Sequence, residues 1–199
     1  MVTRLLLVRH GETDLNAHHQ FQGQMDMPLN DHGRMQAQAL HPLLVAEPIA
    51  AVYVSDLQRA EETRALVLAG RDIATITDQR LRELNFGAWE GLTYDDIQAQ
   101  DAAALAAWEA DMLNHAPPRG ETLAQFAARV QAVVAGIRAQ YADGETVLIV
   151  AHGGVLQLIL CAALNLPPTA YWQFQVKPAS LAEVVFYDAG AILNRLNVR

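Results

Sequence analysis

Two short apolar runs, each leading into a histidine, place the strongest constraint on how this chain can fold. Residues 5–8 run directly into Arg9 and His10, and residues 147–150 are followed two positions later by His152. Each run has the length and composition of a buried strand. In open parallel α/β sheets, ligands bind at the carboxyl ends of the strands. We therefore expect these basic side chains to meet at one edge of one sheet.

A third run brings another basic residue toward the same edge. Residues 50–54 are apolar, and Arg59 follows within five positions. Arg9 and Arg59 would then supply two guanidinium groups, and His10 and His152 two imidazoles. Such a cluster matches a dianion, and a phosphate fits it best.

The rest of the pattern alternates strands with helices. This alternation predicts one α/β domain over residues 1–199, a three-layer α/β/α sandwich with a mostly parallel central sheet. Asn30 or Asp31 is expected to cap one helix, and Ser55 or Asp56 another. The strands are expected over residues 3–9, 50–54, 73–76, 146–151, 181–187 and 192–198, and the helices over residues 31–46, 56–69, 93–115 in two pieces, 121–142 and 154–165.

Composition narrows the function classes. The net charge of −8 disfavours general nucleic-acid binding, because the surface would repel phosphates. No apolar stretch reaches the length of a membrane span, and no signal-peptide pattern is evident. The single cysteine, Cys161, excludes a disulfide within the chain and suits a cytoplasmic location. The apolar C-terminal strand pair offers a surface for a homodimer, which the sequence leaves open.

Phosphoryl transfer explains the remaining polar residues near these strands. The reaction needs cations around the phosphoryl oxygens, an in-line nucleophile and an acid for the leaving group. His10 precedes a glycine, which lets a ligand approach closely, and is our candidate nucleophile. Asn16 and Gln22 are neutral donors. Glu83 is the expected acid, because a phosphate dianion beside it would favour its protonated form; Glu12 is the alternative.

These residues fall within motifs that resemble those of the histidine phosphatase superfamily, also called phosphoglycerate-mutase-like. The blocks follow the family's order from residue 4 to residue 154. They comprise Arg9-His10-Gly11-Glu12-Thr13 with Asn16, Gln22-Gly23 with Asp26 and Pro28, Ser55-Asp56-Leu57 with Arg59, Glu83 with Gly87 and Trp89-Glu90-Gly91, Gly120-Glu121-Thr122, and His152-Gly153-Gly154.

The resemblance implies a role for each matching position. His10 would accept the phosphoryl group as phosphohistidine, and Glu83 would donate the proton and later activate water. The phosphate would be bound by Arg9, Asn16, Gln22, Gly23, Arg59, His152 and Gly153. No metal and no organic cofactor is implied. One departure is Gln20, where many members carry an arginine.

Within the superfamily, the short chain and Trp89-Glu90-Gly91 favour the α-ribazole and broad-specificity phosphatase branch. The expected substrate is a small soluble phosphate ester. Residues 93–119 are the expected lid and specificity segment, with Tyr94, Trp108, His115 and Arg119 as its candidates. A mutase-type isomerase and a non-catalytic phosphate-binding module remain alternatives. A metal-dependent hydrolase is disfavoured, because the ligand spacing of a di-metal centre is absent.

Overall fold

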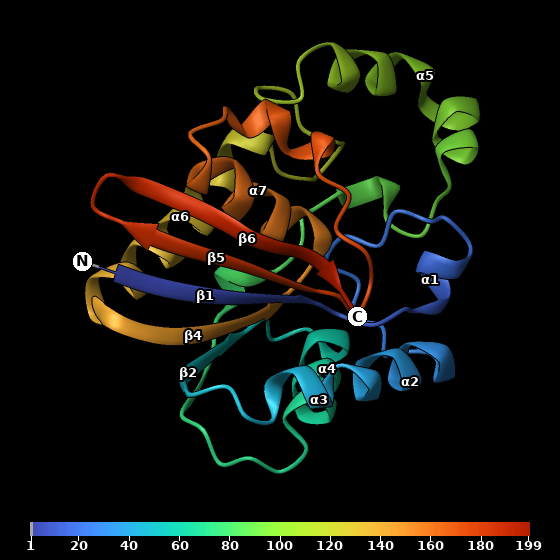
Figure 1. Ribbon diagram of the computed structural model, residues 1–199. Coiled ribbons are helices and arrows are strands. Elements are labelled where there is room, and N and C mark those ends of the chain that lie inside the picture. Colours follow the sequence, from blue (N-terminus) through green and yellow to red (C-terminus); the bar gives the residue numbers. More distant parts are fainter. Residues whose placement is uncertain (1) are drawn as a thin grey trace.

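The computed structural model describes residues 2–199 and has a six-stranded sheet at its centre (Figure 1). The strand order is β3-β2-β4-β1-β5-β6, in which β3, β2, β4 and β1 are parallel, β5 is antiparallel to β1, and β6 is antiparallel to β5. The strands are β1 (Val2–Arg9), β2 (Ile49–Val54), β3 (Thr75–Thr77), β4 (Asp143–Ala151), β5 (Leu181–Tyr187) and β6 (Gly190–Val198). The expected mostly parallel sheet and C-terminal hairpin are confirmed.

The register of the parallel strands aligns the residues that follow them. Val150 of β4 pairs with Val8 of β1 on one side and with Val54 of β2 on the other. The chain therefore leaves all three strands at the same level. His10 and His152 emerge side by side at the carboxyl edge, as the sequence predicts.

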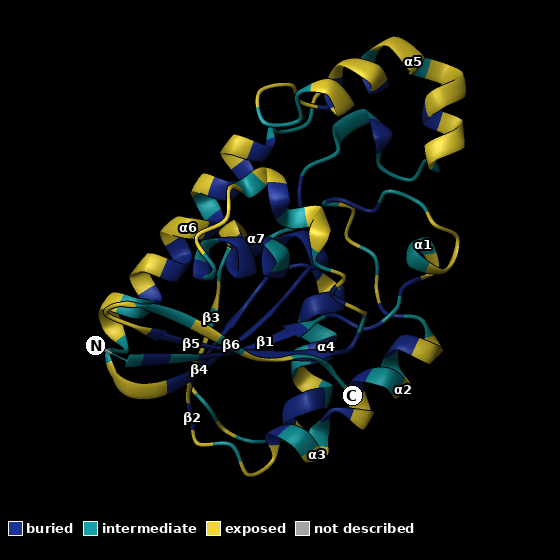
Figure 2. Ribbon diagram, turned by 45° about the horizontal axis from the view of Figure 1, so that its top comes forward, coloured by how far each residue is buried: buried dark blue, intermediate teal, exposed yellow. Residues whose placement is uncertain are grey.

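Helices cover both faces of the sheet and bury it (Figure 2). One core packs α6 and α7 against alternate strand residues such as Leu5, Leu7 and Ile149; the other packs α2, α3 and α4 against Leu6 and Val8. This confirms the three-layer sandwich. The helices are α1 (Asp14–Ala17), α2 (Asp31–Ala39), α3 (His41–Leu44), α4 (Gln58–Leu68), α5 (Tyr94–Ala110), α6 (Leu123–Gln140) and α7 (Gly153–Ala163), with short 3-10 turns η1 (Gln79–Leu81), η2 (Gly87–Trp89) and η3 (Pro168–Gln173). None of the helices within residues 2–199 is long and apolar enough to cross a membrane.

The two predicted helix caps have different outcomes. Asn30 caps α2 as predicted, accepting from the backbone N–H of Gly33. The prediction that Ser55 or Asp56 caps the next helix is wrong, because α4 begins later, at Gln58. The cap comes instead from a distant loop, where Asp26 Oδ1 accepts from the Gln58 N–H at 2.7 Å. This contact ties the loop to the first turn of the helix that carries Arg59.

Helix α5 projects from the rest of the molecule and is largely exposed (Figure 2). Its two pieces meet at Asp101, whose backbone is not helical, which confirms the predicted division. Trp108 on α5 packs edge-on against Trp89 and Phe86, with ring centroids 5.6 and 6.3 Å apart. Both tryptophans are therefore packing residues.

Candidate active site

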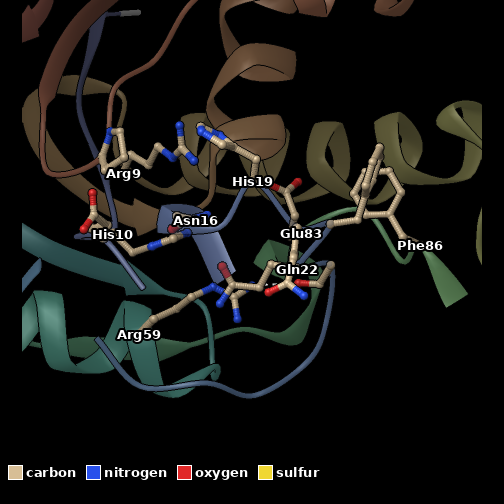
Figure 3. Close-up of a pocket in the computed structure, with 13 residues that line it drawn as sticks. Arg9, His10, Asn16, His19, Gln22, Arg59, Glu83 and Phe86 are labelled. Atoms are coloured by element: carbon tan, nitrogen blue, oxygen red, sulfur yellow. Dashed lines mark hydrogen bonds between the residues drawn. The ribbon is translucent and has the colours of Figure 1, made fainter. Parts of the chain in front are cut away.

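A cavity of about 450 Å³ opens at the carboxyl edge of the parallel strands (Figure 3). Figure 3 shows Arg9, His10 and Arg59 on one side and Phe86 on the other. Most of the residues predicted from sequence line it, joined by several that were not. The lining residues are Arg9, His10, Glu12, Asn16, His19, Gln20, Phe21, Gln22, Gly23, Arg59, Glu83, Phe86 and Pro178.

His10 presents one ring nitrogen for chemistry. Its Nδ1 lies 2.7 Å from the Gly11 carbonyl oxygen, which can only accept, so Nδ1 carries the proton. The lone pair is then on Nε2. Burial lowers the pKa of His10 well below its usual value, and the guanidiniums of Arg59 and Arg9 lower it further. The imidazole is therefore neutral at physiological pH, the form that a nucleophile requires.

Arg59 is fully buried and held by a cradle of acceptors. Its Nη2 donates to the Gly23 carbonyl and its Nη1 to the Met25 carbonyl, both at 2.7 Å. Its Nε donates to His152 Nδ1 at 3.2 Å. Burial lowers the pKa of Arg59 to about 10, so the guanidinium keeps its charge at neutral pH. These three acceptors engage three of the five N–H groups of the guanidinium, and two N–H groups are left for an anion.

His152 lies directly behind His10, with ring centroids 5.1 Å apart. Because Arg59 can only donate to its Nδ1, the His152 proton is on Nε2, which donates to Ser55 Oγ at 2.9 Å. Burial, followed by the charge of Arg59, holds the pKa of His152 well below its usual value. His152 has both nitrogens engaged and is absent from the cavity lining. Its role as a phosphate ligand stays a prediction.

Arg9, the residue directly before His10, also lines the cavity. Its Nη1 donates to the Val176 carbonyl at 2.6 Å, and its buried Nε has no hydrogen-bond partner among residues 2–199. Burial lowers the pKa of Arg9, against the charge of Glu83, which raises it. Gly153 lies against this guanidinium, because a Cβ added there would be 3.3 Å from Arg9 Cζ. Gly153 therefore makes room for Arg9 and does not itself line the cavity.

Two amide side chains complete the polar wall. The Thr13 hydroxyl accepts from the Asn16 N–H, so it donates its own proton to Gln22 Oε1, at 3.0 Å. This fixes the Gln22 amide, whose buried Nε2 has no hydrogen-bond partner in the described part of the chain. Asn16 Oδ1 accepts from the Thr13 N–H, which leaves its NH2 group for a ligand. Both amides therefore offer free donors, as the sequence predicts.

Glu83 is fixed by two backbone donors. Its Oε2 accepts from the Gly154 N–H at 3.0 Å and its Oε1 from the Leu84 N–H at 2.9 Å. The start of α7 thus positions this carboxylate at the cavity wall. Glu12, the alternative acid, also lines the cavity, and its Oε1 accepts from Asn30 Nδ2.

We call the side of the cavity that contains Phe86, across from Arg9, His10 and Arg59, the outer wall (Figure 3). The cavity also has lining residues that the sequence did not single out. Phe21 and Phe86 pack edge-on at 4.9 Å, and His19 and Pro178 line the same cavity. Pro178 reaches the site because β5 pairs with β1, a register that no local signal reveals. By contrast, no member of the predicted set Tyr94, Trp108, His115 and Arg119 lines the cavity.

Comparison with known proteins gives consistent matches. The model of the histidine phosphatase superfamily (branch 1) matches residues 5–199. Adenosylcobalamin/α-ribazole phosphatase of Salmonella typhimurium is 37% identical over 196 residues, covering 98% of this chain and 96% of the relative. Glucosyl-3-phosphoglycerate phosphatase of Mycobacterium tuberculosis is 36% identical over 176 residues, covering 85% and 78%.

Solved structures agree in fold and sequence. The α-ribazole phosphatase of Shigella flexneri superposes with a TM-score of 0.91 at 34% identity, covering 98% of this chain and 96% of that one. A mycobacterial glucosyl-3-phosphoglycerate phosphatase gives a TM-score of 0.88 at 30% identity and covers both chains fully, at 100% each.

Proposed function

The chain belongs to the histidine phosphatase superfamily, and we propose that within it the chain hydrolyses phosphate monoesters whose alcohol portion carries no second negative charge. The family and the phosphatase class are those that the motifs predict. The observation that carries the proposal is where the cavity's charges lie. Its two guanidiniums, Arg9 and Arg59, lie beside His10, whereas Glu12 adds negative charge and Glu83 is assigned to donate a proton.

The proposed reaction has two steps. His10 Nε2 attacks phosphorus as the bond to the ester oxygen breaks, and Glu83 gives that oxygen its proton. Glu83 then takes a proton from water, which attacks phosphorus and releases phosphate from His10. Arg9 and Arg59 stabilise the phosphoryl oxygens in both steps, and the free amide donors of Asn16 and Gln22 assist them.

The alcohol would lie against the outer wall. Phe21 and Phe86 give an apolar aromatic surface there. Such a surface suits a planar, uncharged group. We propose a nucleoside-like alcohol and take α-ribazole phosphate as the first candidate, because the Salmonella and Shigella relatives are named for it.

No arginine or lysine among residues 2–199 lines this outer part of the cavity. Gln20 lies where many family members carry arginine, and its Nε2 donates to the Gly91 carbonyl at 2.5 Å. Arg119 is exposed and does not line the cavity. A carboxylate on the alcohol would therefore face Glu12 without a compensating cation.

We also propose that residues 93–119 form the lid. Their influence on substrate would be indirect, since Trp108 of α5 supports Phe86, which lines the cavity. Gln20 bridges to Thr93 at the start of this segment. The proposal further takes the protein as cytoplasmic, with no nucleic acid or membrane partner.

The test compares two esters of similar size. We expect kcat/KM for a nucleoside 5′-monophosphate to exceed that for 3-phosphoglycerate by about tenfold or more, since two like charges near a protein surface repel by roughly 1–4 kcal/mol. Gln20→Arg should reduce the difference in kcat/KM between the two esters, because it should raise kcat/KM for 3-phosphoglycerate alone. Preference for 3-phosphoglycerate in the wild type would overturn the proposal and favour the mutase alternative.

A further inference from the structure

We propose that Glu90 is a positioning residue, which fastens the loop that holds Arg59 to the loop that carries Glu83. The inference rests on the proposed function, because Glu90 would act by positioning Arg59 and Glu83, whose roles in the reaction are part of that proposal. Glu90 is partly buried and does not line the cavity, so it does not touch substrate.

One carboxylate oxygen makes the connection. Glu90 Oε1 accepts from the Gln24 N–H at 2.8 Å and from the Phe86 N–H at 3.2 Å. The first donor belongs to the loop around Gly23 and the second to the chain after Glu83. A single acceptor thus joins segments far apart in sequence, and its charge strengthens both hydrogen bonds.

The backbone at Gly23 is built around this carboxylate. A Cβ at Gly23 would lie 2.1 Å from Glu90 Oε1, and the Gly23 φ of 51° is in the left-handed region. Only glycine fills that conformation without a clash. The carboxylate therefore occupies space that any other side chain at position 23 would take.

The connection leads directly to the phosphate-binding arginine. The Gly23 carbonyl accepts from Arg59 Nη2, so the position of the Gly23–Gln24 peptide sets where the guanidinium points. Glu90 also acts on Arg59 through space, because its negative charge raises the pKa of that buried guanidinium.

A weaker connection leads to the acid. Gln24 Nε2 donates to the Glu83 carbonyl at 3.2 Å, and Arg129 Nη2 donates to the same carbonyl at 2.8 Å. Gln24 therefore donates its backbone N–H to Glu90 and its side-chain amide to Glu83. Removing the Glu90 carboxylate frees the Gly23–Gln24 peptide, so the acceptor that positions Arg59 would no longer be fixed relative to Glu83.

The test is a double-mutant cycle with p-nitrophenyl phosphate as substrate and inorganic phosphate as inhibitor. Glu90→Ala should lower kcat/KM by about a hundredfold, the typical effect of a displacement near 1 Å in an active site. The phosphate Ki should rise with it. In the Arg59→Ala background, Glu90→Ala should lower kcat/KM much less, because Arg59, the side chain that Glu90 mainly positions, is already absent.

Companion variants separate positioning from folding. Glu90→Gln keeps an oxygen acceptor and should retain most activity, while Glu90→Asp keeps the charge but withdraws the oxygens and should not. Glu145→Ala removes an exposed glutamate on β4 and should match wild type. If Glu90→Ala does not fold, the cycle is run with Glu90→Asp.

Two results would overturn the inference. One is an unchanged phosphate Ki and kcat/KM in folded Glu90→Ala or Glu90→Asp. The other is equal losses in the wild-type and Arg59→Ala backgrounds. Failure of the proposed function is a separate outcome, recognised by a His10→Ala enzyme that is as active as wild type.

Discussion

Replacing Gly154 with alanine tests the position of Glu83 with a single added methyl group. Gly154 is the second residue of α7, and its N–H holds Glu83 Oε2. A Cβ at this position would lie 2.4 Å from Glu83 Oε1 and 2.9 Å from Phe126 Cε1. Ordinary contact begins near 3.4 Å, so the carboxylate must retreat by 3.4 − 2.4, or about 1 Å.

That displacement sets the expected loss. A misplacement of about 1 Å costs roughly a hundredfold in rate, equivalent to about 2.7 kcal/mol in the barrier. The loss should depend on the leaving group, because an acid matters most when the departing alkoxide is a strong base. We expect Gly154→Ala to lower kcat/KM about a hundredfold for an alkyl phosphate, and less than about tenfold for p-nitrophenyl phosphate.

The assay uses kcat/KM because it reports on the steps up to cleavage of the ester bond, which precede the shared hydrolysis of phosphohistidine. Crowding of Phe126 should also lower stability by roughly 1–3 kcal/mol, so rates are measured where thermal unfolding shows the variant folded.

Gly136→Ala is the matched control. Gly136 lies in α6 with no atom within 4 Å of the added Cβ, so activity should be unchanged and stability about 0.5–1 kcal/mol higher. Equal losses on both esters in folded Gly154→Ala would refute Glu83 as the acid.

Two further predictions concern charge at the site. Arg59→Ala should raise the Ki for inorganic phosphate at least about tenfold, since a hydrogen bond between charged partners contributes roughly 1.5–3 kcal/mol; an unchanged Ki would remove Arg59 from the phosphate site. Folding stability should fall on acidification, because burial lowers the pKa values of His10 and His152 and the unfolded chain then binds protons that the folded chain does not. The loss begins below about pH 6.5, at up to about 1.4 kcal/mol per pH unit for each histidine, and is absent above it. Chemical denaturation at pH 7.5 and 5.5 measures this loss of folding stability. His10→Gln removes one of the two histidines; if the variant loses as much stability between these pH values as wild type, His10 does not contribute to the pH dependence.

The sequence predicted the inner site well, because each of its residues follows a recognisable local pattern. His10 and His152 follow apolar strands, and parallel pairing brings the ends of such strands together whatever the loops do. Arg59 is near the start of a helix that follows such a strand. Strand periodicity and parallel packing therefore predict both the fold and the position of the basic side chains Arg9, His10 and Arg59.

The outer wall could not be predicted, because it depends on contacts between distant segments. Pro178 reaches the cavity only through the pairing of β5 with β1, and Phe86 faces Phe21 from a different loop. Helix α4 begins later than expected because its cap is Asp26, 32 positions before Gln58. Such contacts leave no periodic trace in a single sequence.

The central claim is that His10 carries the phosphoryl group. Its most direct test is rapid quenching of wild type and His10→Ala with a 32P-labelled ester in excess EDTA, together with steady-state phosphate release. We predict that wild type forms an acid-labile phosphoenzyme and releases phosphate, whereas His10→Ala does neither. Hydrolysis by His10→Ala at the wild-type rate, or abolition of wild-type activity by EDTA, would contradict the account.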